Sequence, residues 1–278
     1  MRKIAFVSTL EGGPWGGSEE LWSRAAMRLV SQGHDVLACV KRWPDLPPPL
    51  RALQAAGVRL VFWKSPLPLP ERLLSRFLGE PSFLWLDHFR PDLVVISHGA
   101  VHKRTLAWMR ECLERGVPYV LICHGLSPYF WPQDDWMFDY AALSNRAKAY
   151  YFVSQENLRL ARLQLADPLP TAKLVRNPFN VGYDAKPAWP RNGALWKLAC
   201  VARLLPLQKG QDLLFEVLSA WKWRERPLQV TLYGNGPNES NLRALKSARG
   251  LESVAVGGFV SDIESLWAQH HALILPSR

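Results

Sequence analysis

The chain has 278 residues, of which 48% are hydrophobic and 21% charged, and a formal net charge of +10. It is long enough to bury two ordinary cores, and its composition excludes an intrinsically disordered protein. No apolar run reaches the roughly 18 residues of a membrane-spanning helix, and the start MRKIAFVSTL is too short an apolar stretch for a signal peptide, so we expect neither a membrane span nor export by the usual signal.

The excess of basic over acidic residues, with a pI near 9.7, predicts an attraction to anions such as nucleotide phosphates, anionic lipid headgroups or nucleic acid. Nucleic acid is not expected as a partner, because the basic residues are spread singly and no zinc-finger spacing or RNP-like motif occurs. Residues 71–90 combine Arg72, Arg76 and Arg90 with Leu, Phe and Trp. They are a candidate for peripheral membrane contact, with an ordinary amphipathic helix as the alternative.

The four cysteines are scattered along the chain. They are Cys39, Cys112, Cys123 and Cys200, and all but Cys112 stand in apolar, strand-like runs. No CxxC pair or Cys/His cluster with zinc spacing occurs, so we expect buried thiols in a reducing cytoplasm rather than disulfides or a metal site.

The first half of the chain alternates short apolar runs with helical patterns. The runs, each predicted to be a strand, occupy residues 4–8, 35–40, 58–63, 92–97, 118–124, 149–154 and 172–177. Helices are expected at about 103–115 and 155–165, and the proline-rich segment WPDLPPPL at 43–50 is expected to be irregular. Strands that alternate with helices predict an α/β fold with a parallel sheet covered on both faces.

A glycine-rich loop, EGGPWGGSEELW, follows the first predicted strand and leads into the first helix. Ser18 is the expected N-cap of this helix and Gly33 its end. Glycine suits a backbone with positive φ, or a ligand that must come closer than a Cβ allows, and a helix N-terminus favours anions. Because the spacing is not GxGxxG, the residues alone leave open a tight structural turn and a contact to phosphate or sugar.

The pattern is interrupted after Asn177, and residues 181–194 are predicted to be a linker. A second alternating series follows, with predicted strands at 196–203, 228–234, 253–258 and 271–277 and helices at 211–221, 239–248 and 262–269. We therefore predict two α/β domains in tandem, at 1–180 and 195–278. A buried parallel last strand needs further elements to cover it, so we expect that a partner completes the second domain or that the chain is a piece of a longer protein.

Three consecutive strand ends in the second series carry cationic or glycine-bearing loops. Arg203 stands at the end of the first strand, and Lys209 with Gly210 is predicted to open the next helix. Ligands of open parallel sheets bind outside the carboxyl ends of the strands, where two cations can neutralise a diphosphate. The alternative is an exposed arginine and a lysine that merely starts a helix. The segments TLYGNGPNES and VAVGGFVSD repeat the strand-turn-helix arrangement.

These segments resemble the retaining glycosyltransferase family four, whose members have the two-domain GT-B fold. The resemblance rests on RLLPLQKGQDLL, LYGNGPNESNLRAL and VGGFVSDIESLWAQHHALILPSR in the second half, and on GGSEELWSRAA, GHDV and VRNPFNV in the first. It extends over essentially the whole chain. It implies a GT-B-like α/β fold of two Rossmann-like parallel-sheet domains that face a cleft, the second incomplete, with acceptor binding in the first domain and nucleotide-sugar binding in the second.

The resemblance also implies roles for individual residues. Arg203 and Lys209 match the pair that holds the donor diphosphate and stabilises the leaving nucleoside diphosphate, and no metal or other cofactor is expected. His124, in VLICHG, matches a histidine near the transferred sugar, although His98 in VVISHGA stands at a parallel position and either can face the cleft. The donor-binding matches are Gly16, Gly17, Gly234, Gly236, Phe259 and Val260.

The activity implied by the resemblance is transfer of a hexose-type sugar from a nucleoside-diphosphate sugar to a hydroxyl acceptor, lipid-linked acceptors included, with retention. The implied setting is cell-surface polysaccharide or glycolipid synthesis, in the cytoplasm or at the inner face of the plasma membrane. The family's pair of glutamates is expected directly after Pro276 and Ser277 and is missing, so the chain by itself can be inactive. The alternatives are a GT-B nucleotide-sugar epimerase and a non-catalytic sugar- or nucleotide-binding module.

Overall fold

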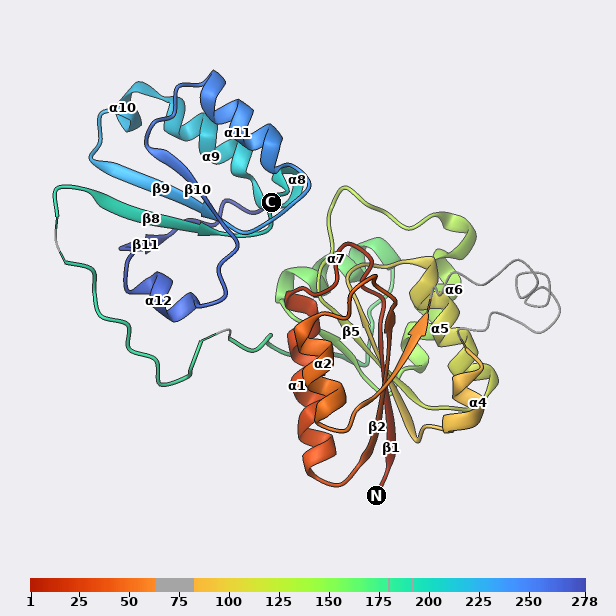
Figure 1. Ribbon diagram of the computed structural model, residues 1–278. Helices are drawn as coiled ribbons and strands as arrows, with labels where there is room; N and C mark the ends of the chain where they lie inside the picture. The colour runs from red at the N-terminus through yellow and green to blue at the C-terminus, as the bar shows by residue number, and fades with distance from the viewer. Residues whose placement is uncertain (64–82, 180, 192) are drawn as a thin grey trace. The chain divides into compact units, whose positions relative to one another are not determined.

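The chain folds into two compact units, which we call unit 1 (Met1–Pro178) and unit 2 (Phe179–Arg278). Figure 1 shows the structure, a computed structural model that describes residues 1–63, 83–179, 181–191 and 193–278. Most of the candidate membrane-contact stretch therefore lies outside the described residues. Within the described part of the chain, no helix combines the length and the apolar character needed to cross a membrane.

Unit 1 is built on a parallel sheet of seven strands among its described residues. The strands are β1 (Lys3–Ser8), β2 (Asp35–Lys41), β3 (Arg59–Trp63), β4 (Leu93–His98), β5 (Tyr119–Cys123), β6 (Tyr150–Phe152) and β7 (Ala172–Leu174), in the spatial order β3-β2-β1-β4-β5-β6-β7. All the strands predicted in the first half are confirmed. The strand order reverses between β1 and β4, and this is the point at which doubly wound sheets open a crevice at their carboxyl edge.

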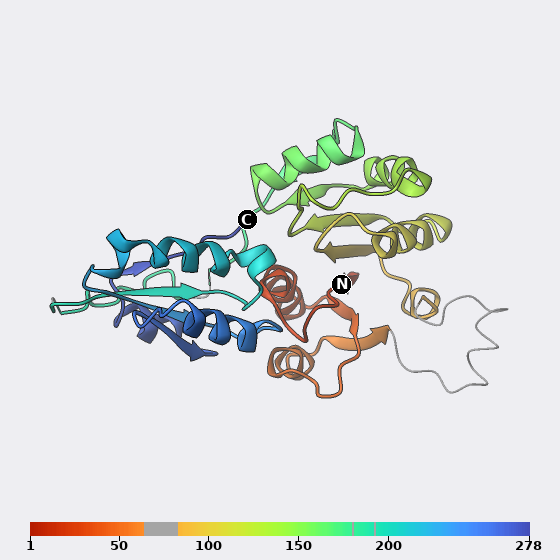
Figure 2. The same ribbon diagram turned by 90° about the horizontal axis from the view of Figure 1, so that it is seen from above.

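Helices cover both faces of this sheet. The helices among the described residues are α1 (Gly17–Ser31), α2 (Pro48–Ala55), α4 (Trp85–Phe89), α5 (Lys103–Glu114), α6 (Asp134–Arg146) and α7 (Gln155–Leu165). In β1, Ile4 and Phe6 join the core beneath α1 and α2, whereas Ala5 and Val7 join the core beneath the other four helices. Figures 1 and 2 show α1 and α2 together on one side of the sheet. This alternation, with both faces apolar, is what a buried parallel strand requires.

Two details of unit 1 differ from the sequence-based expectation. The N-cap of α1 is Gly16, not Ser18, because Ser18 lies in the first turn and donates its hydroxyl to the Glu19 carboxylate (3.2 Å). The proline-rich segment is not irregular throughout, since α2 begins at Pro48. Proline is well suited to the first turn of a helix, where its missing N–H has no partner to lose. The predicted end of α1 is confirmed by Gly33, with φ 81°.

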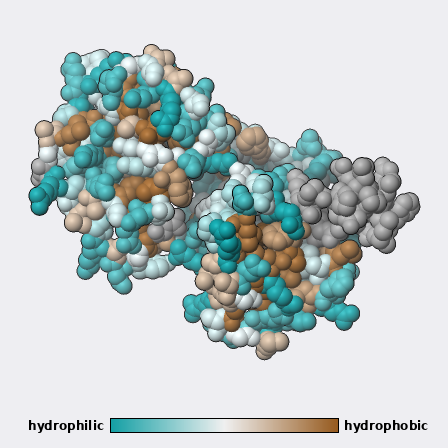
Figure 3. Space-filling view, in the orientation of Figure 1, coloured by the Kyte–Doolittle hydropathy of each residue, from teal (hydrophilic) through white to brown (hydrophobic). Residues whose placement is uncertain are grey.

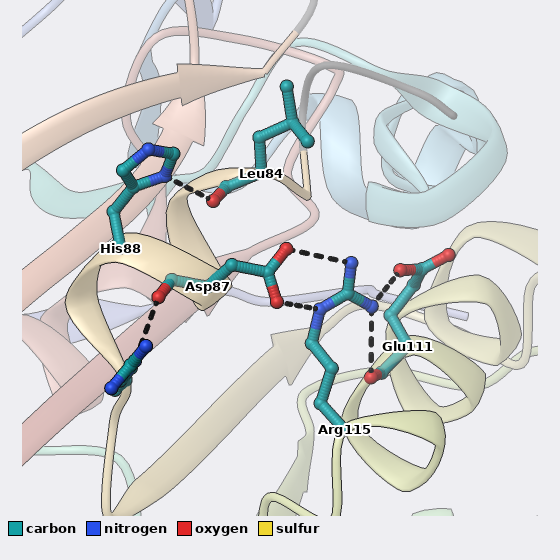
Figure 4. Close-up of polar contacts among 6 residues, drawn as sticks. Leu84, Asp87, His88, Glu111 and Arg115 are labelled. Atoms are coloured by element: carbon teal, nitrogen blue, oxygen red, sulfur yellow. Dashed lines mark hydrogen bonds and ion pairs between the residues drawn. The ribbon is translucent and has the colours of Figure 1, made fainter. Parts of the chain in front are cut away.

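An ion-pair network joins α4 to the end of α5 (Figure 4). The guanidinium of Arg115 donates to both Asp87 carboxylate oxygens (2.9 and 3.2 Å) and to the Glu111 carboxylate (2.5 Å). His88 contacts the Leu84 carbonyl (2.8 Å) within the same short helix. A helix of this length cannot be stable alone, so these contacts and the burial of Leu86 and Phe89 fix its position.

Unit 2 is a smaller parallel α/β unit. Its described strands are β8 (Trp196–Val201), β9 (Leu228–Tyr233), β10 (Val254–Gly258) and β11 (Ala272–Leu273), in the order β10-β9-β8-β11, and its described helices are α8 (Pro206–Lys209), α9 (Gln211–Ser219), α10 (Trp221–Arg224), α11 (Glu239–Ala248) and α12 (Ile263–Trp267). The predicted second α/β series is confirmed, although β11 is much shorter than predicted and the helix predicted at 211–221 ends at Ser219.

The core of unit 2 lies between the sheet and helices α9 and α11. Phe215 of α9, Leu242 of α11 and Val230 and Leu232 of β9 are fully buried in it. The outermost strand is covered less well, since Leu273 is 46% exposed. Figure 3 shows hydrophobic side chains reaching the surface among hydrophilic ones on the viewed face of this unit.

Candidate functional site

The carboxyl edge of the unit 1 sheet gathers three neighbouring strand ends. Ser8 ends β1, His98 ends β4, and His124 follows β5. Main-chain bonds connect them: the Thr9 N–H donates to the Ser97 carbonyl (3.0 Å), and the His124 N–H donates to the His98 carbonyl (2.9 Å). The fold thus brings residues from distant parts of the sequence to the edge at which ligands of such sheets bind.

The glycine-rich loop lies at this edge and offers bare main chain. Gly13, Gly16 and Gly17 all avoid positive φ, and Gly16 is fully extended with φ −161°. A Cβ added to Gly17 would meet no atom within 4 Å, and one added to Gly16 would meet only atoms at 3.9 Å. Backbone conformation and packing therefore do not require these glycines, and the main chain at Gly16 and Gly17 is open to the close approach of another molecule.

His124 is the accessible histidine of the edge. Its Nε2 lies 3.0 Å from the Ser97 hydroxyl, and the ring is half-buried. Burial lowers the pKa of His124 to about 4, against an opposing contribution from the Asn177 side chain. The imidazole is therefore uncharged at neutral pH. Ser97, which bonds to Nε2 of the ring, was not singled out by the sequence-based reasoning.

His98 belongs to the core instead. It is 1% exposed, its Nδ1 contacts the Ala100 carbonyl (3.0 Å), and its ring packs against Tyr140 and Tyr150. Burial lowers the pKa of His98 to about 3. The structure thus separates two histidines that stand at equivalent strand ends and that the sequence could not distinguish.

Glu19, in the first turn of α1, is a charged residue of the edge to which the sequence-based reasoning gave no role, although it stands in the GGSEELWSRAA segment that carries part of the family resemblance. It is 4% exposed and hydrogen-bonded to Ser8, Ser18 and Trp22. The available signal was a glutamate in register with Trp22 and Ala26, which share the buried face of the helix.

The carboxyl edge of the unit 2 sheet presents both predicted cations. Arg203 is exposed in the loop after β8, and its carbonyl accepts a hydrogen bond from Gln211 Nε2 (2.9 Å), which ties the loop to α9. Lys209 does not open α9 as predicted; it is the last residue of α8. Gly210, with φ 63°, ends α8 and caps α9, and a Cβ there would lie 2.0 Å from the Pro276 carbonyl oxygen.

A further arginine lies at the start of α9. Arg278 donates to both carboxylate oxygens of Asp212 (2.9 and 2.7 Å) and to the Pro206 carbonyl (2.7 Å). The Arg278 guanidinium holds the pKa of Asp212 below its usual range. Because this part of the edge carries Arg203, Lys209 and Arg278 against the single carboxylate of Asp212, its net charge is positive.

Gly234 and Gly236 are needed for packing. A Cβ on Gly234 would lie 2.2 Å from the Ala202 carbonyl oxygen, and one on Gly236 would lie 2.2 Å from the Leu204 carbonyl oxygen. The loop after β9 therefore fits against the loop that carries Arg203 only because these positions have no side chain.

The two remaining residues matched to donor binding follow β10. Phe259 is 72% exposed and Val260 is half-buried. Over the residues that the structure describes, no group of three or more His, Cys, Asp and Glu side chains is arranged to hold a metal ion. All four cysteines are buried and free.

Comparison with known protein families identifies the family of this chain. The model described as Glycosyltransferase Family 4 matches residues 15–168, more than half of the chain. The chain belongs to glycosyltransferase family 4. The model described as Glycosyl transferases group 1 matches residues 196–278 of this family 4 chain. No curated protein matches its sequence.

Solved structures similar to this family 4 chain share its fold. Anabaena HepE in complex with UDP and glucose has a TM-score of 0.73 and 19% identity, over 100% of this chain and 74% of that one. The lipopolysaccharide outer core galactosyltransferase WaaB has a TM-score of 0.63 and 17% identity, over 99% and 74% of the two chains. A variant of S. aureus TarM in complex with fondaparinux, alpha-GlcNAc-glycerol and UDP has a TM-score of 0.69 and 8% identity, over 100% and 81%. The fold is of the GT-B type.

The two edges of this family 4 glycosyltransferase differ in chemical character. Unit 1 offers an uncharged imidazole at His124 and the open main chain of Gly16 and Gly17, which suit neutral hydroxyl-bearing groups and close contacts. Unit 2 offers a positive loop with Arg203 and Lys209, which suits an anion.

Proposed function

We propose that the complete protein transfers a hexose-type sugar from a nucleoside-diphosphate sugar to a hydroxyl acceptor with retention of the anomeric configuration. The observation that carries this proposal is the pair Arg203 and Lys209, both placed at the carboxyl edge of the unit 2 sheet in a family 4 chain. The similar HepE structure was solved in complex with UDP-glucose, which supports a nucleotide-sugar donor.

The chemical role of the two cations would be to stabilise charge on the leaving group. Breaking the bond between the sugar and the diphosphate leaves negative charge on the departing phosphate oxygens. Fixed cations near those oxygens lower the barrier, because they are already oriented when the charge develops. Arg203 and Lys209 could supply the positive charge that a divalent metal supplies in other enzymes, and we therefore propose a metal-independent reaction.

Unit 1 would bind the acceptor and contact the transferred sugar. The uncharged His124 ring, hydrogen-bonded to Ser97 through Nε2, would pack against the sugar. The bare backbone at Gly16 and Gly17 would let a donor phosphate or acceptor group come close. Orienting the acceptor hydroxyl against the anomeric carbon would then supply much of the rate enhancement.

The proposed biological setting is polysaccharide or glycolipid synthesis at the cell surface, on the cytoplasmic side. The buried, free state of the four cysteines supports a reducing compartment. WaaB, with a similar fold, is named as a lipopolysaccharide outer core galactosyltransferase, which supports an envelope acceptor. The net charge of +10 would favour peripheral contact with an anionic membrane surface.

The test is the release of nucleotide and the transfer of sugar from a panel of UDP- and GDP-sugars. We expect Arg203→Ala and Lys209→Ala each to lower kcat at saturating donor by about 100-fold, the loss typical of removing one transition-state hydrogen-bond donor. Arg226→Ala is the matched control, because it removes an equal charge from the amino edge of the same sheet, just before β9. Unchanged turnover in the first two variants would show that the diphosphate assignment is wrong.

A further inference from the structure

The carboxylate of Glu19 is the central acceptor of a buried hydrogen-bond network beneath the glycine-rich loop. Oε1 accepts from the Ser8 hydroxyl (3.0 Å) and the Ser18 hydroxyl (3.2 Å), and Oε2 accepts from the Trp22 indole N–H (3.0 Å). All three partners are neutral, and the residue is 4% exposed. Burial raises the pKa of Glu19, although these hydrogen bonds oppose the shift. Burying a carboxyl group without a cation is costly, so a specific geometric role is needed to explain it.

Ser8 links Glu19 to the backbone that follows β1. The Leu10 N–H donates to the Ser8 Oγ (3.2 Å), and the Ser8 hydroxyl donates to Glu19 Oε1 (3.0 Å). The Trp22 indole can only donate. The Glu19 carboxylate accepts on both sides, and it connects α1 through Ser8 to the first residues after β1.

The outer end of the loop is held separately. Glu11 forms an ion pair with Arg104 of α5 (2.6 Å), and its carbonyl accepts from the Lys41 ammonium (3.0 Å). The Trp15 indole donates to Glu20 in the first turn of α1 (2.8 Å). The open glycine backbone of residues 12–17 is thus anchored at both ends, and Glu19 is the anchor that joins β1 to α1.

We infer that Glu19 is a positioning residue for the transfer reaction, because its carboxylate ties the end of β1 to the first turn of α1 and so fixes the open main chain of residues 12–17. This inference rests on the proposed function. Glu19 itself does not reach a substrate, since both of its oxygens are occupied and buried. Its effect on catalysis comes from keeping the loop in one conformation before the substrate binds.

The decisive variant is Glu19→Gln, which keeps the size of the side chain. With the amide oxygen kept on the Trp22 indole, the NH₂ group takes the place of Oε1, so the Ser8 and Ser18 hydroxyls lose the charged acceptor to which they donate. Ser8→Ala is the second variant; it removes the bond between Ser8 and Glu19 together with the acceptor of the Leu10 N–H, and it leaves the bonds of Glu19 to Trp22 and Ser18 in place. Glu156→Gln is the matched control, because Glu156 lies in the first turn of α7 and pairs on the surface with Arg159.

Two measurements test the inference on the full chain. Amide hydrogen exchange by NMR should show Leu10 exchanging at least about tenfold faster in Glu19→Gln, while Glu156→Gln matches the wild type. With a transferable donor, kcat should fall about 10- to 100-fold, while the donor KM changes less than about threefold and the thermal midpoint stays near that of the wild type.

Specific experimental results would overturn the inference about Glu19. A folded Glu19→Gln protein with wild-type kcat overturns the inference, whatever its exchange rates. If Glu19→Gln does not fold, Ser8→Ala decides through kcat, because this variant removes the acceptor of the Leu10 N–H and speeds its exchange whatever Glu19 does: a reduced kcat supports the inference, and a wild-type kcat overturns it. If the wild-type protein transfers no sugar from any donor, the proposed function fails, and the Leu10 exchange rates alone show whether Glu19 fixes the loop.

Discussion

Glycines occur at the carboxyl edges of both sheets, but they satisfy different physical requirements. In unit 2, Gly236 is required because its Cβ would lie 2.2 Å from the Leu204 carbonyl oxygen. In unit 1, a Cβ at Gly17 would extend into open space and the backbone has no positive φ. One glycine therefore serves the packing of the fold, and the other leaves a surface open to an approaching molecule.

A pair of alanine substitutions should separate these two roles. Gly17→Ala should leave unfolding unchanged or stabilise the protein by up to about 1 kcal/mol, since alanine is the better helix former, while the donor KM rises about tenfold. Gly236→Ala should destabilise the protein by about 1–3 kcal/mol, because backbone must move to make room. Denaturant unfolding and donor kinetics on both variants check this. A wild-type donor KM in Gly17→Ala would contradict a ligand contact at the loop.

Individual side chains differ in whether their place in the structure could be predicted from the sequence. Arg203 and Lys209 could be chosen in advance because their positions follow from the ends of apolar runs. Glu19 could not, since a glutamate in an amphipathic helix is ordinarily exposed, and its burial depends on Ser8 and Trp22 lying around it. Likewise, the difference between His98 and His124 depends on tertiary contacts, among them the packing of Tyr140 and Tyr150 around His98.

At the scale of elements, the short helix α4 shows how an electrostatic contact can stabilise local structure. Asp87 of α4 receives two hydrogen bonds from Arg115, which follows α5 (Figure 4). These hydrogen bonds lower the pKa of Asp87 from its usual value of 3.8. A carboxyl whose pKa is lowered by folding stabilises the folded state above its unfolded pKa, and this contribution is lost as the pH falls through the folded value.

We therefore expect the effect of Asp87→Asn to depend on pH. Near neutral pH the variant should be less stable than the wild type. The difference should shrink as the pH falls from 3.8 through the lower pKa of the folded state, where the carboxyl of the folded wild type becomes protonated. High salt should also reduce the difference, since Asp87 is exposed. Urea unfolding over a pH series measures it, with Arg115→Met in a double-mutant cycle. A difference that does not change with pH would assign the effect to packing.

Elements also differ in how well the sequence predicted them. The strands were predicted well because a doubly covered parallel strand needs a continuous apolar run, which is visible without knowing its neighbours. The helix α2 was missed because its first turn lies within a run of prolines, which suggests an irregular segment. Proline is unfavourable only in the interior of a helix, so these prolines did not argue against a helix that begins at Pro48.

At the scale of the whole molecule, the two units have separate hydrophobic cores. The buried clusters of unit 1 lie on either face of its own sheet, and the cluster of unit 2 lies beneath α9 and α11. The units should therefore respond separately to a ligand that one of them binds. If Arg203 and Lys209 bind the diphosphate, that ligand is a nucleoside diphosphate and the responding unit is unit 2.

UDP should then stabilise unit 2 selectively. At a concentration about 100 times its dissociation constant, a ligand that binds only the native state adds about 2.7 kcal/mol to stability. Hydrogen-exchange mass spectrometry with UDP should show slower exchange in peptides from β8 to α9, and the double variant Arg203→Ala, Lys209→Ala should lose this protection. Protection confined to unit 1 would place the diphosphate elsewhere.

The sequence by itself determined the strands, the two α/β units and the position of the two cations, because these follow from local apolar runs and from which residue ends each run. Only the tertiary structure decided which histidine is accessible, which glycines are sterically required, and that Glu19 is buried beneath the loop. Those properties depend on atoms that folding brings together from distant positions, such as Gly236 against Leu204 and Ser8 against Glu19. A local sequence pattern does not predict such contacts.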